Sequence, residues 1–287
     1  MKKYVIISPV RNEEDFLPTT LQCVVDQTIL PAEFIIVNDG STDRSPEIIK
    51  KFTSRYPWIR TIDRPKGEHR PGDGVVEAFY AGYDCLTTRD WDYIVKLDGD
   101  LQFPPDYFEF QLNAMNENPL LGMSSGKTWQ PHDGRLVLDS MPDDHVRGPA
   151  KLYRRACYEA IGGLQKVRGW DTIDELKAQV LGWETRSFEH LVLVHFKPIG
   201  FKQTNICKRE LHLGERQHYL GYHPLFAIAR GLYVACKKPY LIAGVLNIAG
   251  FWMAKLSGAK QIDEPAMIHH LRNKQLQRLT FRRRLLG

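Results

Sequence analysis

Short runs of apolar residues alternate with longer amphipathic segments along the first hundred residues of the chain. β-Branched and aromatic residues fill the short runs, whereas apolar residues recur at helical spacing in the segments between them. The runs predict buried parallel strands at 4–7, 34–37, 59–62 and 93–97, with helices between them at 13–27, 45–56 and 74–87. Such alternation is typical of right-handed βαβ units on a mostly parallel sheet.

The hydrophobic pattern becomes less regular beyond Asp106. It predicts helices at 107–116 and 172–181, mixed strands at 123–138, a strand leading into a helix at 150–161, and a strand at 191–196. Residues 207–222 are rich in Arg, His and Gly and predict a loop. Ser45, followed by Pro46, predicts the N-cap of the second helix.

Two apolar stretches, at 224–235 and 239–254, lie near the carboxyl end and are separated by Lys237-Lys238. The second stretch carries no charge, but it contains Asn247 and is shorter than the roughly 20 apolar residues of a membrane-spanning helix. A basic tail without acidic residues follows from Pro265 to Gly287. Two interpretations stay open: a helical hairpin that lies in an anionic membrane face, or an ordinary packing surface.

Composition narrows the class of protein. The chain has 287 residues, of which 43% are hydrophobic and 25% charged, as in globular proteins. Its net charge of +5 is modest, and no recognition motif accompanies the basic tail, which disfavours a nucleic-acid binder. The five cysteines form no C-x-x-C, which argues against a disulfide framework or a zinc site. Because the apolar start is too short for a signal peptide, we expect a cytoplasmic protein.

Three polar clusters stand where predicted strands end. Ser8 to Glu14 follow the first strand, Asn38 to Asp43 the second, and Asp98-Gly99-Asp100 the fourth. In open parallel sheets, ligands bind beyond the carboxyl ends of the strands. Two carboxylates at such an end can hold Mg²⁺ or Mn²⁺, which also binds diphosphate oxygens. Each cluster alone is equally compatible with a turn or a helix cap.

The three clusters together resemble glycosyltransferase family 2, whose members have the GT-A fold. The family's P-x-x-N-E-E, V-D-D-G-S-T-D and D-x-D motifs match in order and separation over about residues 4 to 200, with Asn38 in place of the first aspartate. The resemblance implies that Asp39 contacts a uracil or thymine ring, that Asp98 contacts the ribose or the metal, and that Asp100 is a metal ligand. The implied nucleotide site comprises Pro9, Val10, Arg11, Asn12, Glu13, Asp39, Gly40, Ser41, Asp98 and Gly99.

An inverting transfer also needs a base. The acceptor hydroxyl attacks the anomeric carbon directly, so a carboxylate must take its proton. The segment from Gly169 to Leu176 resembles the family's acidic helix start, G-x-E-D-x-D-L, with Trp170 in place of the glutamate. Counting back from Gly182-Trp183, which resembles the family's helix end, implies Asp171 as the base, with Asp174 next. A capping box with Asp171 as N-cap is the alternative.

Further candidates are basic residues. Arg64, Lys66 and Arg70 follow the third strand and would either meet the donor diphosphate or be solvated. A second set, in the predicted loop, would form a lid that excludes water or contacts the diphosphate: Arg209, His212 and Arg216. His195, in a predicted strand, is interpreted as a core histidine.

The sequence therefore predicts an α/β fold with a GT-A-type, Rossmann-like, mostly parallel sheet flanked by helices. The glycosyltransferase domain would span 1–205, with a nucleotide-binding half at 1–105 and an acceptor half at 106–205. The loop, the apolar hairpin and the basic tail would form a helical, membrane-associated appendage at 206–287.

The predicted function is metal-dependent, inverting glycosyl transfer with Mn²⁺ or Mg²⁺ from a UDP- or dTDP-sugar. The expected acceptor is a lipid-linked saccharide or an envelope-glycan precursor at the inner face of the cytoplasmic membrane. A polyprenyl-phosphate sugar synthase is the nearest alternative. A sugar nucleotidyltransferase is disfavoured because Ser8 to Glu14 lack glycine, and a non-catalytic binding protein because the acidic pairs are present.

Overall fold

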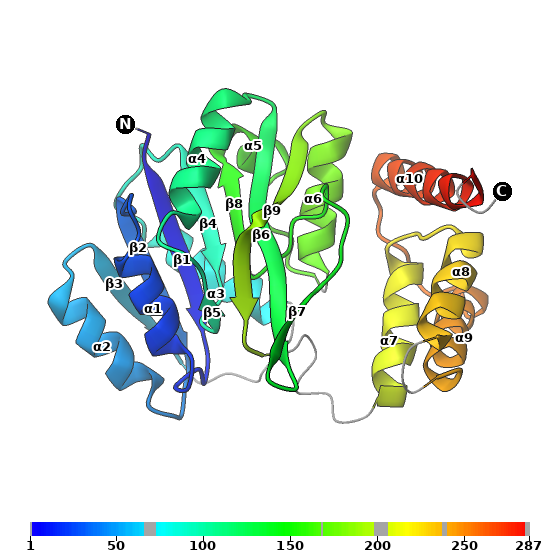
Figure 1. Ribbon diagram of the computed structural model, residues 1–287, viewed down its shortest axis with the longest axis horizontal. Helices are drawn as coiled ribbons and strands as arrows, with labels where there is room; N and C mark the ends of the chain where they lie inside the picture. The colour runs from blue at the N-terminus through cyan, green and yellow to red at the C-terminus, as the bar shows by residue number, and fades with distance from the viewer. Residues whose placement is uncertain (1, 66–72, 168, 198–205, 237–239, 285–287) are drawn as a thin grey trace. The chain divides into compact units, whose positions relative to one another are not determined.

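The computed structural model describes residues 2–65, 73–167, 169–197, 206–236 and 240–284 (Figure 1). The chain divides into two compact units, Met1–Pro198 and Ile199–Gly287. The first unit is a sheet with helices on both faces, and the second consists of helices.

The sheet of the first unit has the strand order β3-β2-β1-β4-β8-β6-β9-β5, and β7 pairs with β6. Its strands are β1 (Tyr4–Val10), β2 (Glu33–Asp39), β3 (Ile59–Arg64), β4 (Tyr93–Leu97), β5 (Leu101–Gln102), β6 (Leu121–His132), β7 (Arg135–Leu138), β8 (Ala150–Arg154) and β9 (Glu184–His195). The first four strands pair in parallel, β1 with both β2 and β4, and β2 with β3. β8 is antiparallel to β4, so the sheet is mixed beyond that point. The predicted α/β fold, with a mostly parallel sheet flanked by helices, is confirmed.

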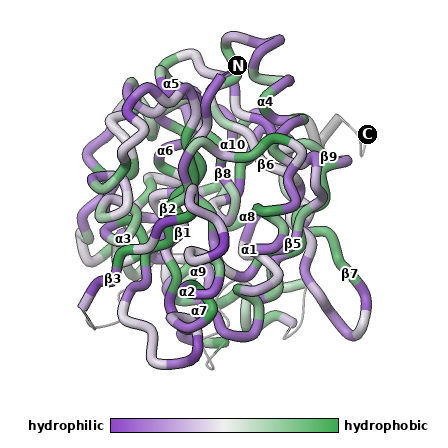
Figure 2. Tube along the Cα trace, turned by 90° about the vertical axis from the view of Figure 1, so that its left-hand side faces the viewer, coloured by the Kyte–Doolittle hydropathy of each residue, from purple (hydrophilic) through white to green (hydrophobic). Residues whose placement is uncertain are grey.

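The helices of the first unit cover both faces of the sheet (Figure 1). They are α1 (Leu17–Val25), α2 (Ser45–Arg55), α3 (Asp73–Asp84), α4 (Tyr107–Glu117), α5 (Arg155–Ala160) and α6 (Trp170–Val180). Leu21 of α1, Ile49 of α2 and Phe108 of α4 belong to one buried cluster. Phe79 of α3 and Tyr158 of α5 belong to the cluster on the other face. Hydrophobic stretches, green in Figure 2, thus alternate with polar ones along the chain: β1, β2 and β4 are buried on both faces, whereas each helix buries one.

Two predicted helix caps are wrong. The N-cap of α2 is Arg44, and the Ser45 hydroxyl instead accepts a hydrogen bond from the Glu13 amide at 2.9 Å. Ser45 therefore connects the start of α2 to the loop that follows β1. The N-cap of α6 is Gly169, whose φ of 93° suits glycine, and Asp171 lies inside the first turn. The strand predicted at 191–196 is only the second half of β9, which begins at Glu184.

The second unit contains α7 (Ile206–Tyr219), α8 (Pro224–Ala235), α9 (Ile242–Leu256) and α10 (Pro265–Arg284). The prediction of a loop at 207–222 is wrong, because α7 occupies most of it. Its stability comes from packing: a Cβ on Gly214 would lie 2.1 Å from the Asn247 carbonyl oxygen, and one on Gly250 would lie 2.2 Å from that of Leu211. The backbones of α7 and α9 therefore touch at glycines. Asn247, in the middle of α9, accepts a hydrogen bond from Gln217 of α7 at 2.8 Å.

The apolar stretches predicted near the carboxyl end form α8 and α9. Within the described ranges, no helix combines the length and apolarity that crossing a membrane requires. The basic tail forms α10, which packs on the same unit: Met267 and Leu271 are buried, and Arg272 donates to the Gly221 carbonyl at 2.8 Å.

Candidate functional site

Three side chains of the types that ligate metal ions meet at the carboxyl end of β4. Asp98 and Asp100 follow this strand, and His195 is the last residue of β9, opposite Leu101 of β5. One ligand atom from each of the three side chains lies within 4.8 Å of the other two, and His195 Nε2 is 3.2 Å from Asp100 Oδ2. His195 is buried, as a core histidine would be, but its ring faces the carboxylate. Two carboxylates and an imidazole fit a divalent cation.

The two carboxyl groups of this cluster have different environments. Burial and the neighbouring Asp100 charge raise the pKa of Asp98, while Lys96, which forms an ion pair with it, opposes the shift. Burial also raises the pKa of Asp100, but the hydrogen bond and charge of His195 outweigh it, and the pKa lies below its usual range. The lowered pKa of Asp100 therefore reflects its pairing with His195.

The loops after β1 and β2 hold each other in place. Asn12 has a left-handed φ of 56°, its amide donates to Ser41 Oγ at 3.1 Å, and its Oδ1 accepts from the Thr42 amide at 2.8 Å. The Glu14 amide donates to Asp43 Oδ2 at 3.0 Å. The segment predicted to hold a nucleoside, from Pro9 to Glu13, therefore lies against Gly40 and Ser41.

Asp39 stands between two arginines at the end of β2. Arg64 Nη1 is 2.6 Å from Asp39 Oδ1, and Arg11 Nη1 is 3.7 Å from Asp39 Oδ2. Arg64 also reaches Glu77 at 3.6 Å. Of the three basic residues predicted after the third strand, Arg64 thus lies at the site, whereas Lys66 and Arg70 lie outside the described residues.

Glu13 connects this loop to the metal cluster. A Cβ on Gly99 would lie 3.3 Å from Glu13 Cγ, so the loop packs directly on the Asp98-Gly99-Asp100 turn. Lys197, two residues after His195, pairs with the Glu13 carboxylate and donates to the Asn12 carbonyl at 3.1 Å. Burial raises the pKa of Glu13 to about 7, against the lowering effect of Lys197.

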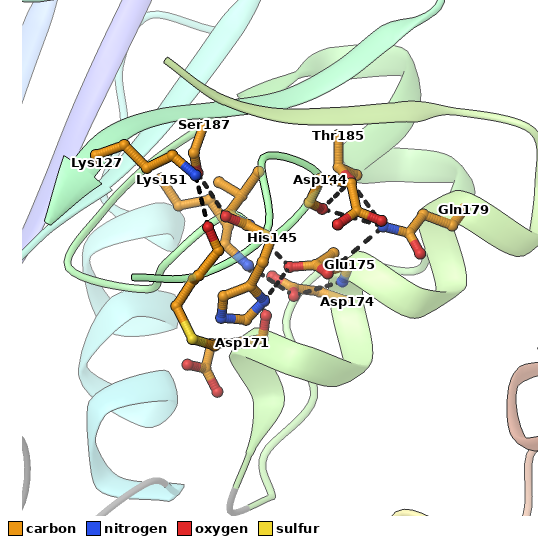
Figure 3. Close-up of polar contacts among 12 residues, drawn as sticks. Lys127, Asp144, His145, Lys151, Asp171, Asp174, Glu175, Gln179, Thr185 and Ser187 are labelled. Atoms are coloured by element: carbon orange, nitrogen blue, oxygen red, sulfur yellow. Dashed lines mark hydrogen bonds and ion pairs between the residues drawn. The ribbon is translucent and has the colours of Figure 1, made fainter. Parts of the chain in front are cut away.

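The two candidate bases differ sharply. Asp174 is buried on α6, where Lys151 Nζ is 2.9 Å from its Oδ1 and the Tyr153 hydroxyl donates to its Oδ2. Burial raises the pKa of Asp174 to about 6, although Lys151 lowers it. Asp171, one turn earlier, is only partly buried. Figure 3 shows Asp174 inside the polar network of this region.

The segment before β8 places Asp171 near the metal cluster. The Asp98 amide donates to the Pro149 carbonyl at 2.7 Å, and Lys96 Nζ donates to the Gly148 carbonyl at 3.1 Å. On the other side, a Cβ on Gly148 would lie 3.2 Å from Asp171 Cβ. Asp98 and Asp171 therefore flank the same two residues.

The remainder of this segment is fastened to α6 and β9 (Figure 3). His145 Nδ1 lies 2.9 Å from Glu175 Oε2, which also accepts from the Val146 amide at 2.9 Å. Thr185 Oγ1 of β9 donates to the Asp144 carbonyl at 2.6 Å. The wall beside Asp171 is consequently built from side chains far apart in sequence.

The lid candidates lie in the other unit. Arg209, His212 and Arg216 belong to α7, and Arg209 pairs with Glu210 at 3.0 Å. Their placement in a loop is wrong, and their contact with donor or diphosphate stays a prediction.

Sequence reasoning missed several side chains of the site. The sequence pattern favours a core histidine at position 195, and it does not single out Lys96, Lys151 or Lys197. Each is brought to the site by strand pairing, β9 with β5 and β8 with β4. A charged residue in an otherwise apolar strand, such as Lys96 in Tyr93–Leu97, was the available signal.

The fold and the site define a class: an α/β protein with a candidate divalent-metal cluster beyond the carboxyl ends of its first strands. Residues 5–137 match the family model described as Glycosyl transferase family 2, the family whose motifs the sequence resembles.

Curated relatives of this chain include proteins named as a glycosyltransferase and as a chondroitin synthase. The glycosyltransferase YibD of Escherichia coli (strain K12) is 28% identical over 150 residues, which cover 52% of this chain and 41% of that protein. Chondroitin synthase of Pasteurella multocida is 30% identical over 136 residues, covering 47% of this chain and 13% of that protein. The chain thus spans less than half the length of these relatives.

Solved structures share the fold. A mannosyltransferase from Pyrobaculum calidifontis, in complex with GDP-Man and Mn²⁺, superposes with a TM-score of 0.57 at 16% identity, covering 92% of this chain and 77% of that one. TarS from S. aureus, in complex with UDP-GlcNAc, gives a TM-score of 0.53 at 14% identity, covering 89% and 73%. At such low identity the likeness shows the fold, which confirms the GT-A-type prediction.

Proposed function

We propose that this protein is an inverting glycosyltransferase that moves a sugar from a UDP- or dTDP-sugar to a hydroxyl acceptor with the help of Mn²⁺ or Mg²⁺. The observation that carries the proposal is the Asp98–Asp100–His195 cluster, which shares the Gly148-Pro149 segment with Asp171. The proposed cation site and the proposed proton acceptor thus lie on two sides of one short segment.

Asp98, Asp100 and His195 would hold the metal. The bound cation would neutralise the charge that develops on the departing diphosphate. The mannosyltransferase with the same fold was solved with Mn²⁺, which supports this choice of ion.

Asp39 and its two arginines favour a uracil or thymine base. The order Arg11–Asp39–Arg64 presents a donor, an acceptor and a donor. Uracil and thymine offer the complementary order, with O2 and O4 as acceptors on either side of the N3–H donor. Guanine would place its amino group against an arginine. Of the solved structures with a similar fold, one holds GDP-Man and another holds UDP-GlcNAc. The two arginines favour a uridine nucleotide over a guanosine nucleotide.

Asp171 is the proposed base. Its carboxylate would take the proton of the acceptor hydroxyl as that oxygen bonds to the anomeric carbon. The bond from this carbon to the diphosphate oxygen breaks at the same time, and its electron pair leaves with the diphosphate. Asp174 is too enclosed to meet an acceptor, because Lys151 and Tyr153 occupy its carboxylate.

The proposed acceptor is a lipid-linked saccharide or envelope-glycan precursor, reached by peripheral contact with the inner face of the cytoplasmic membrane. A relative that is 31% identical over 112 residues, covering 37% of this chain and 31% of that protein, is named an undecaprenyl-phosphate 4-deoxy-4-formamido-L-arabinose transferase of Pectobacterium carotovorum. This name also favours the alternative, a polyprenyl-phosphate sugar synthase.

A panel of UDP-, dTDP- and GDP-sugars tests the proposal. With Mn²⁺ present, we expect slow hydrolysis of a UDP- or dTDP-sugar, measured as released nucleoside diphosphate and abolished by a chelator. Asp100→Asn should lose this activity while its circular dichroism stays that of the wild type. Preference for a GDP-sugar would refute the assignment of the base, and turnover that survives chelation would remove the metal from the mechanism.

A further inference from the structure

The side of α9 that faces away from its neighbouring helices is apolar along its whole length. Ile242, Val245, Met253 and Leu256 are between 58% and 82% exposed and recur at helical spacing. We call these four residues the α9 outer face. The opposite side of α9 carries the glycines and Asn247 that pack on α7 and α8. The outer face is therefore not needed to hold the unit together.

The charged residues of α8, of α9 and of the segment from α9 to Lys260 that the structure describes are all basic. The sequence has no acidic residue between Glu215 and Asp263, whereas Arg230, Lys255 and Lys260 are exposed. Lys255 lies over the ring of Trp252, 4.9 Å from its centre. Indole rings and lysines that border an apolar helix face are typical of helices lying at a bilayer surface.

We propose that the α9 outer face docks on an anionic lipid bilayer, with α9 parallel to the membrane plane. Its apolar side chains enter the acyl boundary, while Lys255 and Lys260 meet lipid phosphates. A second copy of this chain is the other occupant that such a face could take. The single sign of charge disfavours it, because two copies would bring like charges together. The inference specifies how the proposed membrane contact is made, and it does not require glycosyl transfer to be correct.

Vesicle sedimentation of the full chain tests the docking face. The probes are vesicles of phosphatidylcholine alone and of phosphatidylcholine mixed with phosphatidylglycerol. The test variant is Val245→Gln with Met253→Gln, because glutamine keeps helix propensity while removing apolar area. The matched control is Leu136→Gln with Val137→Gln, a pair on β7 with 48% and 49% exposure.

We expect the wild type and the β7 control to bind mixed vesicles, and the α9 variant to bind at least about tenfold more weakly. Replacing Lys255 by glutamine should weaken binding to mixed vesicles about fivefold and leave binding to neutral vesicles unchanged. Equal binding by the wild type and the α9 variant would overturn the proposal. The proposal would also be overturned if analytical ultracentrifugation showed a dimer for the wild type and a monomer for the α9 variant.

The assay contains no nucleotide-sugar, so it separates the two proposals. Vesicle binding without sugar transfer would refute only the proposed function. Sugar transfer by a protein that does not bind vesicles would refute only the docking face.

Discussion

Replacing each acidic residue of α6 in turn separates structure from catalysis. Asp174 is buried with Lys151, whose side chain is itself fully buried. Asp174→Asn leaves that ammonium without its carboxylate, and breaking a buried pair typically costs about 3–5 kcal/mol. Lys151 keeps its 2.7 Å hydrogen bond to the Asp171 carbonyl, so we expect the lower end, about 3 kcal/mol. For a unit of this size, that cost lowers the melting temperature by roughly 6–12 °C.

Asp171→Asn should have the opposite profile. Its side chain is only partly buried at the start of α6, so its loss should cost no more than about 1 kcal/mol of unfolding free energy. Turnover should fall by about 10²–10⁴, which is what a general base contributes. Donor affinity should remain that of the wild type, because Asp39 and the metal cluster are unchanged.

The assay pairs thermal unfolding, followed by circular dichroism, with nucleoside diphosphate release in Mn²⁺. Both variants are measured at a temperature well below the melting point of the less stable one. A wild-type melting temperature for Asp174→Asn, combined with lost turnover, would show that Asp174 and not Asp171 is the base. Full turnover by Asp171→Asn would refute the assignment outright.

Three further predictions concern the metal cluster, the loop that packs on it and the second unit. His195→Ala should raise the Mn²⁺ concentration for half-maximal turnover by at least about tenfold, and an unchanged Mn²⁺ titration would remove this ligand. Burial raises the pKa of Glu13 to about 7, so this carboxyl stabilises the fold most below pH 4.5 and loses that contribution as pH rises through 7. The melting temperature of the metal-free wild type, relative to that of Glu13→Gln, should therefore fall over this range, and a constant difference would contradict the argument. Gly214→Leu would press a side chain onto the Asn247 carbonyl and should lower the unfolding free energy of the second unit by several kcal/mol. Denaturant unfolding identical to that of the wild type would show that the glycine contact is unimportant.

The first half of the sheet could be predicted because its signals are local. β-Branched runs such as Tyr4–Ile7 have no competing helical period, and Asp-Gly pairs follow the second and fourth of these strands. Parallel pairing then brings Asp39 and Asp98 to one edge of the sheet without further information. The structure places both at strand ends on this edge.

The predictions that were wrong or incomplete concern residues whose structure depends on contacts between distant segments of the chain. Residues 207–222 have a polar, glycine-containing composition that resembles a loop. They form α7 because Gly214 lets the helix touch α9, a partner about thirty residues later. His195 likewise joins the metal cluster only because β9 pairs with β5. The spacing of residues within α7 or within β9 does not indicate that these elements pair with α9 and β5.

The tryptophan at position 170 is the clearest departure from the family's acidic helix start, and the structure gives its physical context. Trp170 is buried, and its ring has Lys96 Nζ at 5.3 Å and Lys151 Nζ at 5.8 Å from its centre. A second carboxylate here would lie close to Asp174 and Asp98, each already paired with one of these lysines. An indole face attracts both ammonium groups without adding negative charge. The two buried lysines and the tryptophan are therefore one feature, and they connect the metal side of the site to the helix that carries Asp171.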